Sequence, residues 1–231
     1  MDFSSFRLLA AGSDLGVEPA ARADADGIEL RMDFAEAPLE QLAGYDGELP
    51  VLVTNRVARE GGEAADDAER LDVLERAVEH EAVTAVDLEL AALDGTGDHD
   101  ATRVADHARD HGASVVVSTH DFESTPAREV IAERLERACT YGDVGKMATT
   151  AESADDVLAM LGATRDLAAA GKQVATMCMG EAGRHSRVVA PLYGSRIGYA
   201  PVDPEAATAP GQYDLATLRS LVEQLESDYW P

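Results

Sequence analysis

The chain has 231 residues, enough for one large domain or two small ones with a substantial core. Its 44 Asp and Glu residues against 19 Lys and Arg give a formal net charge of −25, which argues against nucleic acid and anionic membranes as partners because both attract basic surfaces. No apolar run approaches the roughly 18 residues of a membrane span, and the first residues lack the basic-then-apolar order of a signal peptide, so we expect a cytoplasmic protein.

The acidic residues are spread along the chain, and only two of the basic residues, Lys146 and Lys172, are lysines. Abundant acid, scarce lysine and 5% aromatic residues are together typical of proteins from a high-salt cytoplasm, with an ordinary acidic enzyme as the alternative. Cys139 and Cys178 are too few for a disulfide framework or a metal site. Both lie in apolar stretches, which predicts buried thiols.

Short β-rich runs alternate with amphipathic helical stretches along the whole chain. The strands start about 20 to 32 residues apart, which is the length of a βα unit. Eight strands are predicted, at Phe6–Ala11, Gly27–Met32, Pro50–Asn55, Ala82–Leu90, Ala113–His120, Val144–Thr149, Gln173–Met179 and Ser195–Ala200. Helices are expected at Pro38–Ala43, Ala64–His80, Ala101–Asp110, Pro126–Cys139, Ala151–Ala170 and Leu215–Leu225, with Ser124-Thr125 capping the one that starts at Pro126.

This alternation predicts a parallel sheet with right-handed crossovers. Eight such repeats predict an α/β protein whose residues 1–231 form a single domain, a (β/α)8 TIM barrel. A doubly wound open sheet is the alternative, and the absence of Gly-x-Gly-x-x-Gly after the first strand disfavours it. In a barrel the active site lies where strands end, so polar residues at strand ends are the candidates.

The second and third predicted strands carry unexpected charge. Glu29 and Arg31 share one face of the second strand and would line the mouth of a barrel, unless the strand is an exposed edge. Arg56 ends the third strand, and Glu60 follows in the loop Arg59–Glu63. This arrangement would suit an anionic or hydroxylated ligand, although a solvated loop would explain it equally well.

His120 and Lys146 are predicted on neighbouring strands. A neutral imidazole at the end of the fifth strand could exchange protons near neutral pH, unless His120 caps the turn through Asp121. Lys146 lies in an apolar run, where an ammonium is costly unless it is paired or neutral. A neutral amine would attack carbonyl groups and form a Schiff base, whereas an edge strand would simply expose Lys146 to water. Adjacent strands lie about 4.8 Å apart, so the two side chains could meet over one substrate atom.

The remaining candidates follow the sixth strand. Met177 and Met179 share a face and would form an apolar wall that favours the neutral amine, or would simply pack in the core. Arg187 could clamp a carboxylate with two parallel hydrogen bonds. Thr208 and Gln212 carry hydrogen-bonding side chains after the eighth strand, in either a ligand loop or an ordinary surface loop.

Taken in order, these motifs resemble the type I 3-dehydroquinate dehydratases of the shikimate pathway over nearly the whole chain. Each motif alone is weak, but together and in order they are highly specific. The resemblance rests on Glu29-Leu-Arg31-Met-Asp33, Arg56 with Glu60-Gly-Gly-Glu63, Ser118-Thr-His120-Asp-Phe122 with Thr125-Pro126, Gly145-Lys146, Met177-Cys-Met179-Gly180 with Gly183 and Ser186-Arg187, and Ala209-Pro-Gly-Gln212.

The resemblance implies a (β/α)8 barrel, usually a homodimer, that converts 3-dehydroquinate to 3-dehydroshikimate and water in aromatic amino-acid biosynthesis without metal or cofactor. It implies that Lys146 forms the Schiff base, that His120 is the general acid/base, and that Glu60 orients His120. Arg187 would hold the substrate carboxylate. Further residues would contact substrate hydroxyls or shape the site, namely Glu29, Arg31, Arg56 and Gln212, with Met177 and Met179 as the apolar wall.

The sequence also departs from the family pattern. Thr208 stands where the family commonly has serine, so its substrate contact is carried over on the hydroxyl alone, and Cys178 stands where serine is frequent. Two other hypotheses are a class I aldolase-like barrel and a non-catalytic quinate-type binding protein. Arg187, and the lack of a phosphate-binding glycine loop, disfavour the first. The presence of both Lys146 and His120 disfavours the second.

Overall fold

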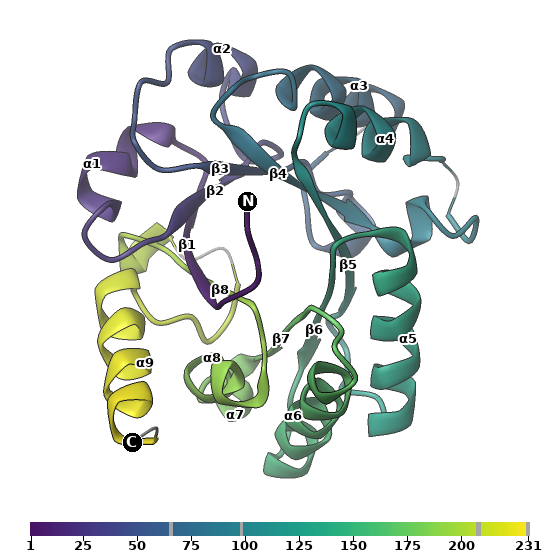
Figure 1. The fold of residues 1–231 in the computed structure, drawn as a ribbon, viewed down its shortest axis with the longest axis vertical. Helices are drawn as coiled ribbons and strands as arrows, with labels where there is room; N and C mark the ends of the chain where they lie inside the picture. The colour runs from purple at the N-terminus through teal and green to yellow at the C-terminus, as the bar shows by residue number, and fades with distance from the viewer. Residues whose placement is uncertain (65–66, 98, 207–208, 230–231) are drawn as a thin grey trace.

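The computed structural model describes residues 1–64, 67–97, 99–206 and 209–229. Within them, eight parallel strands form a ring that helices surround (Figure 1). The strands run in the order β7-β6-β5-β4-β3-β2-β1-β8. They are β1 (Arg7–Gly12), β2 (Gly27–Arg31), β3 (Val51–Thr54), β4 (Val83–Glu89), β5 (Ser114–Asp121), β6 (Val144–Thr150), β7 (Val174–Met179) and β8 (Ile197–Ala200).

The ring closes between β7 and β8 at their amino-terminal ends. A parallel bridge joins Val174 to Ser195, and the Arg196 N–H donates to the Val174 carbonyl at 2.8 Å. The Ser195 hydroxyl accepts from the Thr176 N–H at 3.0 Å. The predicted (β/α)8 barrel is therefore confirmed and the open sheet is wrong, although β8 itself begins at Ile197 and not at Ser195.

Helices occupy most of the predicted intervals. Those longer than four residues are α2 (Pro38–Ala43), α3 (Asp67–Ala77), α4 (Thr102–Asp110), α5 (Arg128–Tyr141), α6 (Ala154–Ala169) and α9 (Leu215–Tyr229). The sequence missed the four-residue helices α1 (Glu18–Ala21), α7 (Gly180–Gly183) and α8 (Ser186–Val189), and the 3-10 helices Leu15–Val17, Ala58–Glu60, Leu90–Ala92, Ala190–Tyr193 and Pro204–Ala206. Such elements complete about one turn, which is too short to show a 3.6-residue period.

The predicted helix start at Pro126 is wrong. α5 begins at Arg128, and its N-cap Ala127 makes no side-chain capping bond. The Thr125 hydroxyl instead donates to the Thr150 carbonyl at 2.8 Å. Thr125 therefore ties the loop after β5 to the end of β6.

Successive side chains of a strand point alternately outward and inward, so the barrel has two hydrophobic cores, one under the helices and one in its interior. Leu88 and Val117 face the surrounding helices, whereas Ala85 and Val116 face the barrel interior. Cys178 is buried as predicted, but Cys139 is only partly buried, and both thiols are free. Among the described residues, no helix combines the length and the apolar character that crossing a membrane requires.

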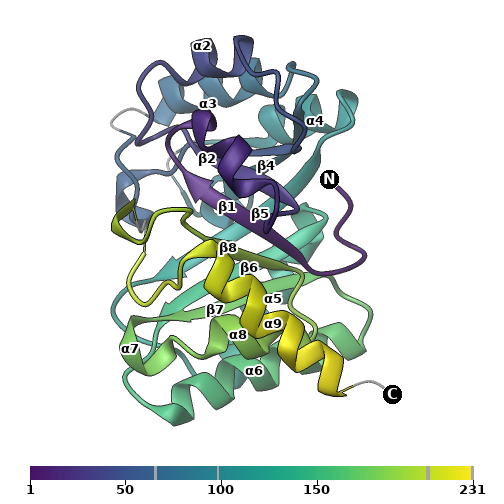
Figure 2. The same cartoon turned by 90° about the vertical axis from the view of Figure 1, so that its left-hand side faces the viewer.

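The first residues close the amino-terminal end of the barrel. Phe3 is 3% exposed and packs in the interior cluster, and the Met1 amino group donates to the Thr84 carbonyl. The Ser114 hydroxyl donates to the Met1 carbonyl at 2.8 Å. Figure 2 shows the N-terminus at the end of the barrel opposite α7. The carboxyl end of the ring is therefore the one left open for a ligand.

Candidate active site

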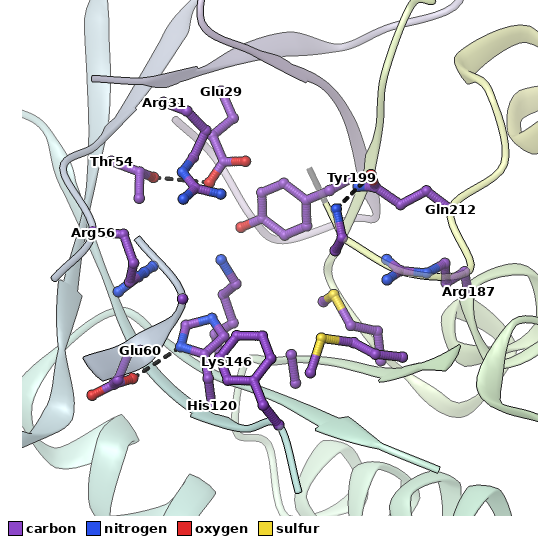
Figure 3. A pocket seen from close by; sticks show the side chains of 16 residues that line it. Glu29, Arg31, Thr54, Arg56, Glu60, His120, Lys146, Arg187, Tyr199 and Gln212 are labelled. Carbon is purple, nitrogen blue, oxygen red and sulfur yellow. Dashed lines mark hydrogen bonds and ion pairs between the residues drawn. The ribbon is translucent and has the colours of Figure 1, made fainter. Parts of the chain in front are cut away.

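A pocket opens at the carboxyl ends of the strands (Figure 3). Ten of the eleven predicted site residues line it, and Thr208 lies outside the described residues. The ten are Glu29, Arg31, Arg56, Glu60, His120, Lys146, Met177, Met179, Arg187 and Gln212. Sequence reasoning gave no site role to the other six pocket residues, although three of them, Gly61, Phe122 and Ala209, lie in the motifs that carry the resemblance. The remaining three are Thr54, Ala148 and Tyr199.

Lys146 points into the barrel because of its place in β6. Val144 and Ala148, two residues to either side, belong to the interior cluster, so the two-residue period turns Lys146 inward. α5 packs closely on this strand, since a Cβ on Gly145 would lie 2.8 Å from both the Cys139 sulfur and the Leu135 carbonyl oxygen. Lys146 is 5% exposed, so the alternative of a solvated edge lysine is wrong.

The Lys146 nitrogen is paired with a buried carboxylate. Nζ donates to Oδ2 of Asp87 at 2.8 Å, and the Tyr199 ring centroid lies 4.3 Å from Nζ on another side. The setting of the amine therefore differs from the expected apolar one, because it includes a buried carboxylate that can offset the desolvation of an ammonium. Sequence reasoning missed Asp87 because it considered only strand ends. The two-residue period that selected Glu29 and Arg31 would also have selected Asp87.

Asp87 is held as a carboxylate. Its Oδ1 accepts from Arg56 Nη2 at 2.7 Å and from the Ser118 hydroxyl at 2.6 Å. Burial by itself would raise the pKa of Asp87, but Arg56 and Lys146 outweigh burial and hold that pKa well below its usual range. The same attraction raises the pKa of Arg56 despite its burial. Both members of the Arg56–Asp87 pair are therefore charged at neutral pH.

Arg56 is bonded largely to the protein itself. Its Nη1 donates to Glu89 Oε1 at 2.9 Å and to the Ser118 hydroxyl at 2.7 Å, and Glu89 also pairs with Arg70 at 2.9 Å. Arg56 lines the pocket, but it also fixes the carboxylates of β4. Its contact with a substrate hydroxyl stays a prediction.

His120 faces the pocket and is bonded to Glu60. Nδ1 of His120 lies 2.9 Å from Glu60 Oε2, and the Phe122 ring stacks at a centroid distance of 6.0 Å. Gly61, at φ +79°, turns the chain directly after Glu60 in the left-handed region that glycine favours. The turn after β5 is closed by Asp121, which accepts from the Ser124 N–H at 2.9 Å, so His120 does not cap it.

The two members of the His120–Glu60 pair have pKa values shifted in opposite directions. Burial, and then the Arg56 and Lys146 cations, lower the pKa of His120 well below 6.5. Burial raises the pKa of Glu60 to about 7, with Arg56 opposing the change and Glu89 adding to it. Near neutral pH, His120 is thus an uncharged imidazole beside a carboxyl group that titrates.

Arg187 is a buried cation without a carboxylate partner among the described residues. Nη2 donates to the Pro210 carbonyl at 3.4 Å, and the buried Nε has no hydrogen-bond partner in the described chain. Burial lowers the pKa of Arg187 to about 10. Figure 3 shows Arg187 across the pocket from Arg56, and Met177 and Met179 line the same pocket. This geometry suits the binding of an anion by two parallel hydrogen bonds.

The β2 side of the pocket is polar. Glu29 Oε1 accepts from the Thr54 hydroxyl at 2.8 Å, while Arg31 pairs with Asp33 at 2.6 Å and stacks on Phe34. On the opposite rim, the Gln212 side-chain oxygen accepts from the Ala209 N–H at 3.1 Å. These groups offer both donors and acceptors to a hydroxylated ligand.

The pocket as a whole combines an amine, an uncharged imidazole and a guanidinium that no carboxylate of the described residues pairs with. Such a set suits covalent chemistry on a carbonyl compound that also carries an anionic group. No group of three or more His, Cys, Asp or Glu residues in the described chain could hold a metal ion.

Known proteins with similar sequences share one description. A family model described as type I 3-dehydroquinase matches residues 14–229. The 3-dehydroquinate dehydratase of Haloarcula marismortui is 78% identical over 99% of this chain and all of that one. The enzyme of Halobacterium salinarum is 47% identical over 98% of this chain and all of that one. These halophilic relatives agree with the acidic, lysine-poor composition.

Solved structures agree with the sequence matches. The 3-dehydroquinate dehydratase of Geobacillus kaustophilus has a TM-score of 0.87 at 27% identity, covering 98% of this chain and 93% of that one. The type I enzyme of Clostridium difficile, with covalently modified comenic acid, has a TM-score of 0.83 at 27% identity, covering 97% and 93%. A phosphoribosylanthranilate isomerase of Pyrococcus furiosus, at 12% identity and a TM-score of 0.58, shares the fold alone.

Proposed function

The chain belongs to the type I 3-dehydroquinase family, and on that basis we propose that it is a hydro-lyase that dehydrates 3-dehydroquinate through a Schiff base on Lys146. The product is 3-dehydroshikimate. The observation that carries this proposal is a buried amine in a pocket that also holds an uncharged imidazole and a guanidinium with no carboxylate partner among the described residues. These are the groups that imine formation, proton transfer and binding of a carboxylate each require.

The first half of the reaction builds the imine. Lys146 must give up one proton before it attacks the C3 ketone, and the uncharged His120 is the acceptor on the neighbouring strand. The attack gives a carbinolamine. His120 then returns a proton to the former carbonyl oxygen, which leaves as water and produces the protonated imine. Protons pass only between Lys146, His120 and water, so the sequence of steps balances without an added cofactor.

The second half eliminates water from the ring. The protonated imine withdraws electrons and acidifies the neighbouring C2 proton, which His120 removes. The electron pair left on C2 expels the C1 hydroxyl, which takes the proton from His120 and leaves as water. Hydrolysis of the imine then frees the product. Glu60 supports this role by fixing the ring of His120 through Nδ1, which leaves Nε2 for the substrate.

Arg187 is proposed to bind the substrate carboxylate, because its buried guanidinium lacks a carboxylate partner in the described chain. Met177 and Met179 exclude water beside the imine. Further residues are proposed to contact the ring hydroxyls or to shape the site, namely Glu29, Arg31, Arg56 and Gln212. The homodimer and the cytoplasmic location also stay proposals, and light scattering of the purified protein tests the first.

Trapping of the imine tests the function directly. Borohydride added together with 3-dehydroquinate should reduce the imine to a stable amine, and mass spectrometry of peptides should place the adduct on Lys146. The Lys146→Ala variant should form no adduct and lose nearly all turnover, measured as the absorbance of the conjugated enone. Lys172 is a control within the same chain. An unmodified Lys146 in active wild-type enzyme would contradict the proposal.

A further inference from the structure

We propose that Asp87 is the counter-ion of the Lys146 nitrogen in both of its charged states, the resting ammonium and the protonated imine. Asp87 acts through Lys146 and so is a positioning residue. This inference rests on the proposed Schiff-base function and adds to it a residue inside β4.

The geometry around Asp87 fixes its carboxylate in place. The side chain is fully buried, and Oδ2 lies 2.8 Å from Nζ of Lys146. The other oxygen is held from two directions, by Arg56 at 2.7 Å and by Ser118 at 2.6 Å. The carboxylate therefore cannot rotate away from Nζ without losing two further hydrogen bonds. Solvent salt screens such a buried pair only weakly.

The chemistry requires a cation on this nitrogen at both ends of imine formation. An ammonium and a ketone give a protonated imine and water, so the positive charge on Nζ is the same before and after. Only the intervening free amine and carbinolamine are neutral. Because Nζ stays attached to Lys146 throughout, one carboxylate already in contact with it serves both cations.

Other charged and titratable groups near Nζ are engaged elsewhere. Glu29 accepts from Thr54, Glu60 is bonded to His120, and Arg31 is paired with Asp33. The Tyr199 ring covers another side of Nζ. Burial and the Glu29 and Asp87 charges raise the pKa of Tyr199 well above 10, so its phenol stays neutral. Among the described residues, Asp87 is thus the carboxylate that directly neutralises Lys146.

This pairing has two opposite consequences. Asp87 suppresses the free amine at rest, which slows any reagent that needs a neutral Lys146. Asp87 also stabilises the protonated imine relative to the neutral carbinolamine, which favours the loss of water that forms the imine. Removing the negative charge should therefore make Lys146 more reactive towards simple reagents and less effective in turnover. Damage to the fold alone would not raise amine reactivity selectively at this position.

The test compares labelling with turnover in Asp87→Asn. Cyanate, which carbamylates only neutral amines, is applied at several pH values between about 6 and about 10, and mass spectrometry gives the labelling of Lys146 relative to Lys172. An opposite charge within about 4–6 Å favours the charged form by about 1–3 pH units, so the ratio at neutral pH should rise about 10- to 1000-fold. The kcat should fall about 10- to 100-fold, with a smaller change in KM, because charge-assisted hydrogen bonds are of this strength.

Glu89→Gln is the matched control. It neutralises a second buried carboxylate of β4 that contacts Arg56 and Arg70 but not Lys146, so the labelling ratio should stay at the wild-type value. If Asp87→Asn does not fold, Ser118→Ala weakens the hold on Asp87 and should raise the ratio to a smaller extent. An unchanged ratio in the folded variant, or an equal rise in Glu89→Gln, overturns the inference. Successful borohydride trapping in the wild type would still leave the proposed function standing.

Discussion

The two sides of the pocket hold their buried cations in opposite ways (Figure 3). On the β3–β6 side, Lys146 and Arg56 are both paired with Asp87. On the other side, Arg187 is equally buried, but no carboxylate in the described chain pairs with it. Lys146 and Arg56 are thus neutralised by the protein itself, whereas Arg187 remains available to pair with an anionic ligand.

The contrast follows from what each cation has to do. Lys146 carries a positive charge before and after imine formation, so an internal partner stabilises it throughout. Desolvating a cation without a partner is costly, and at Arg187 this cost is offset only when an anion enters. A substrate carboxylate would therefore find its partner at Arg187 and not at the already neutralised Arg56.

The largest expected effect on turnover comes from replacing His120, on the side of the pocket where Lys146 and Arg56 pair with Asp87. His120→Ala should lower kcat by about 10²- to 10⁴-fold, the usual contribution of a general acid/base. The amine would remain beside Asp87, so borohydride should still trap some imine on Lys146. Rates of product formation and of adduct formation measure the two effects. Near-normal turnover in this variant would remove His120 from the mechanism.

Replacing Arg187, on the other side of the pocket, is expected to have a smaller effect, and that effect should be on substrate binding. Arg187→Gln should raise KM and lower kcat/KM by about 10- to 100-fold, because a charge-assisted hydrogen bond contributes roughly 1.5–3 kcal/mol. Steady-state kinetics followed by the product absorbance give both constants. Arg165→Gln, which removes an exposed arginine of α6, is the control and should leave KM unchanged. An equal loss in both variants would mean that net charge, and not the Arg187 site, controls affinity.

The smallest effect concerns the pH dependence that Glu60 imposes on His120. Below its pKa of about 7, Glu60 is protonated and donates to Nδ1, which places the ring proton on Nε2. Above that pH, the carboxylate accepts from Nδ1–H and Nε2 is free to take the C2 proton. In the wild type, kcat should therefore rise as the pH increases through about 7.

Glu60→Gln should abolish that rise and lower kcat several-fold. The kcat of this variant should fall only at a pH well below 7, where His120 becomes protonated, because burial and nearby cations depress the pKa of His120. Glu63→Gln changes an exposed carboxylate in the same loop and should keep the wild-type profile. If kcat of Glu60→Gln still rises through neutral pH, the group that titrates there is not Glu60.

The fold was largely predictable because its signals are local. The short β-rich runs placed each predicted strand to within a few residues, and the two-residue alternation along β6 turns Lys146 inward. The one-turn helices α7 and α8 were not predictable, because they are too short to show a period. The helix start predicted at Pro126 was wrong for another reason. Thr125 bonds to the backbone at the end of the next strand and does not cap the helix that follows it.

By itself, the sequence determined that most of the predicted charged side chains reach one pocket, although it did not reveal Tyr199 or Asp87. Strand order and alternation act over a few residues, and they are enough to turn Glu29, His120 and Lys146 towards one cavity. Only the tertiary structure decided how these side chains are paired. Lys146 meets Asp87 across 59 residues of chain, while Arg187 meets no carboxylate in the described structure. Pairing depends on the distances between side chains across the barrel, and spacing along the chain does not encode those distances.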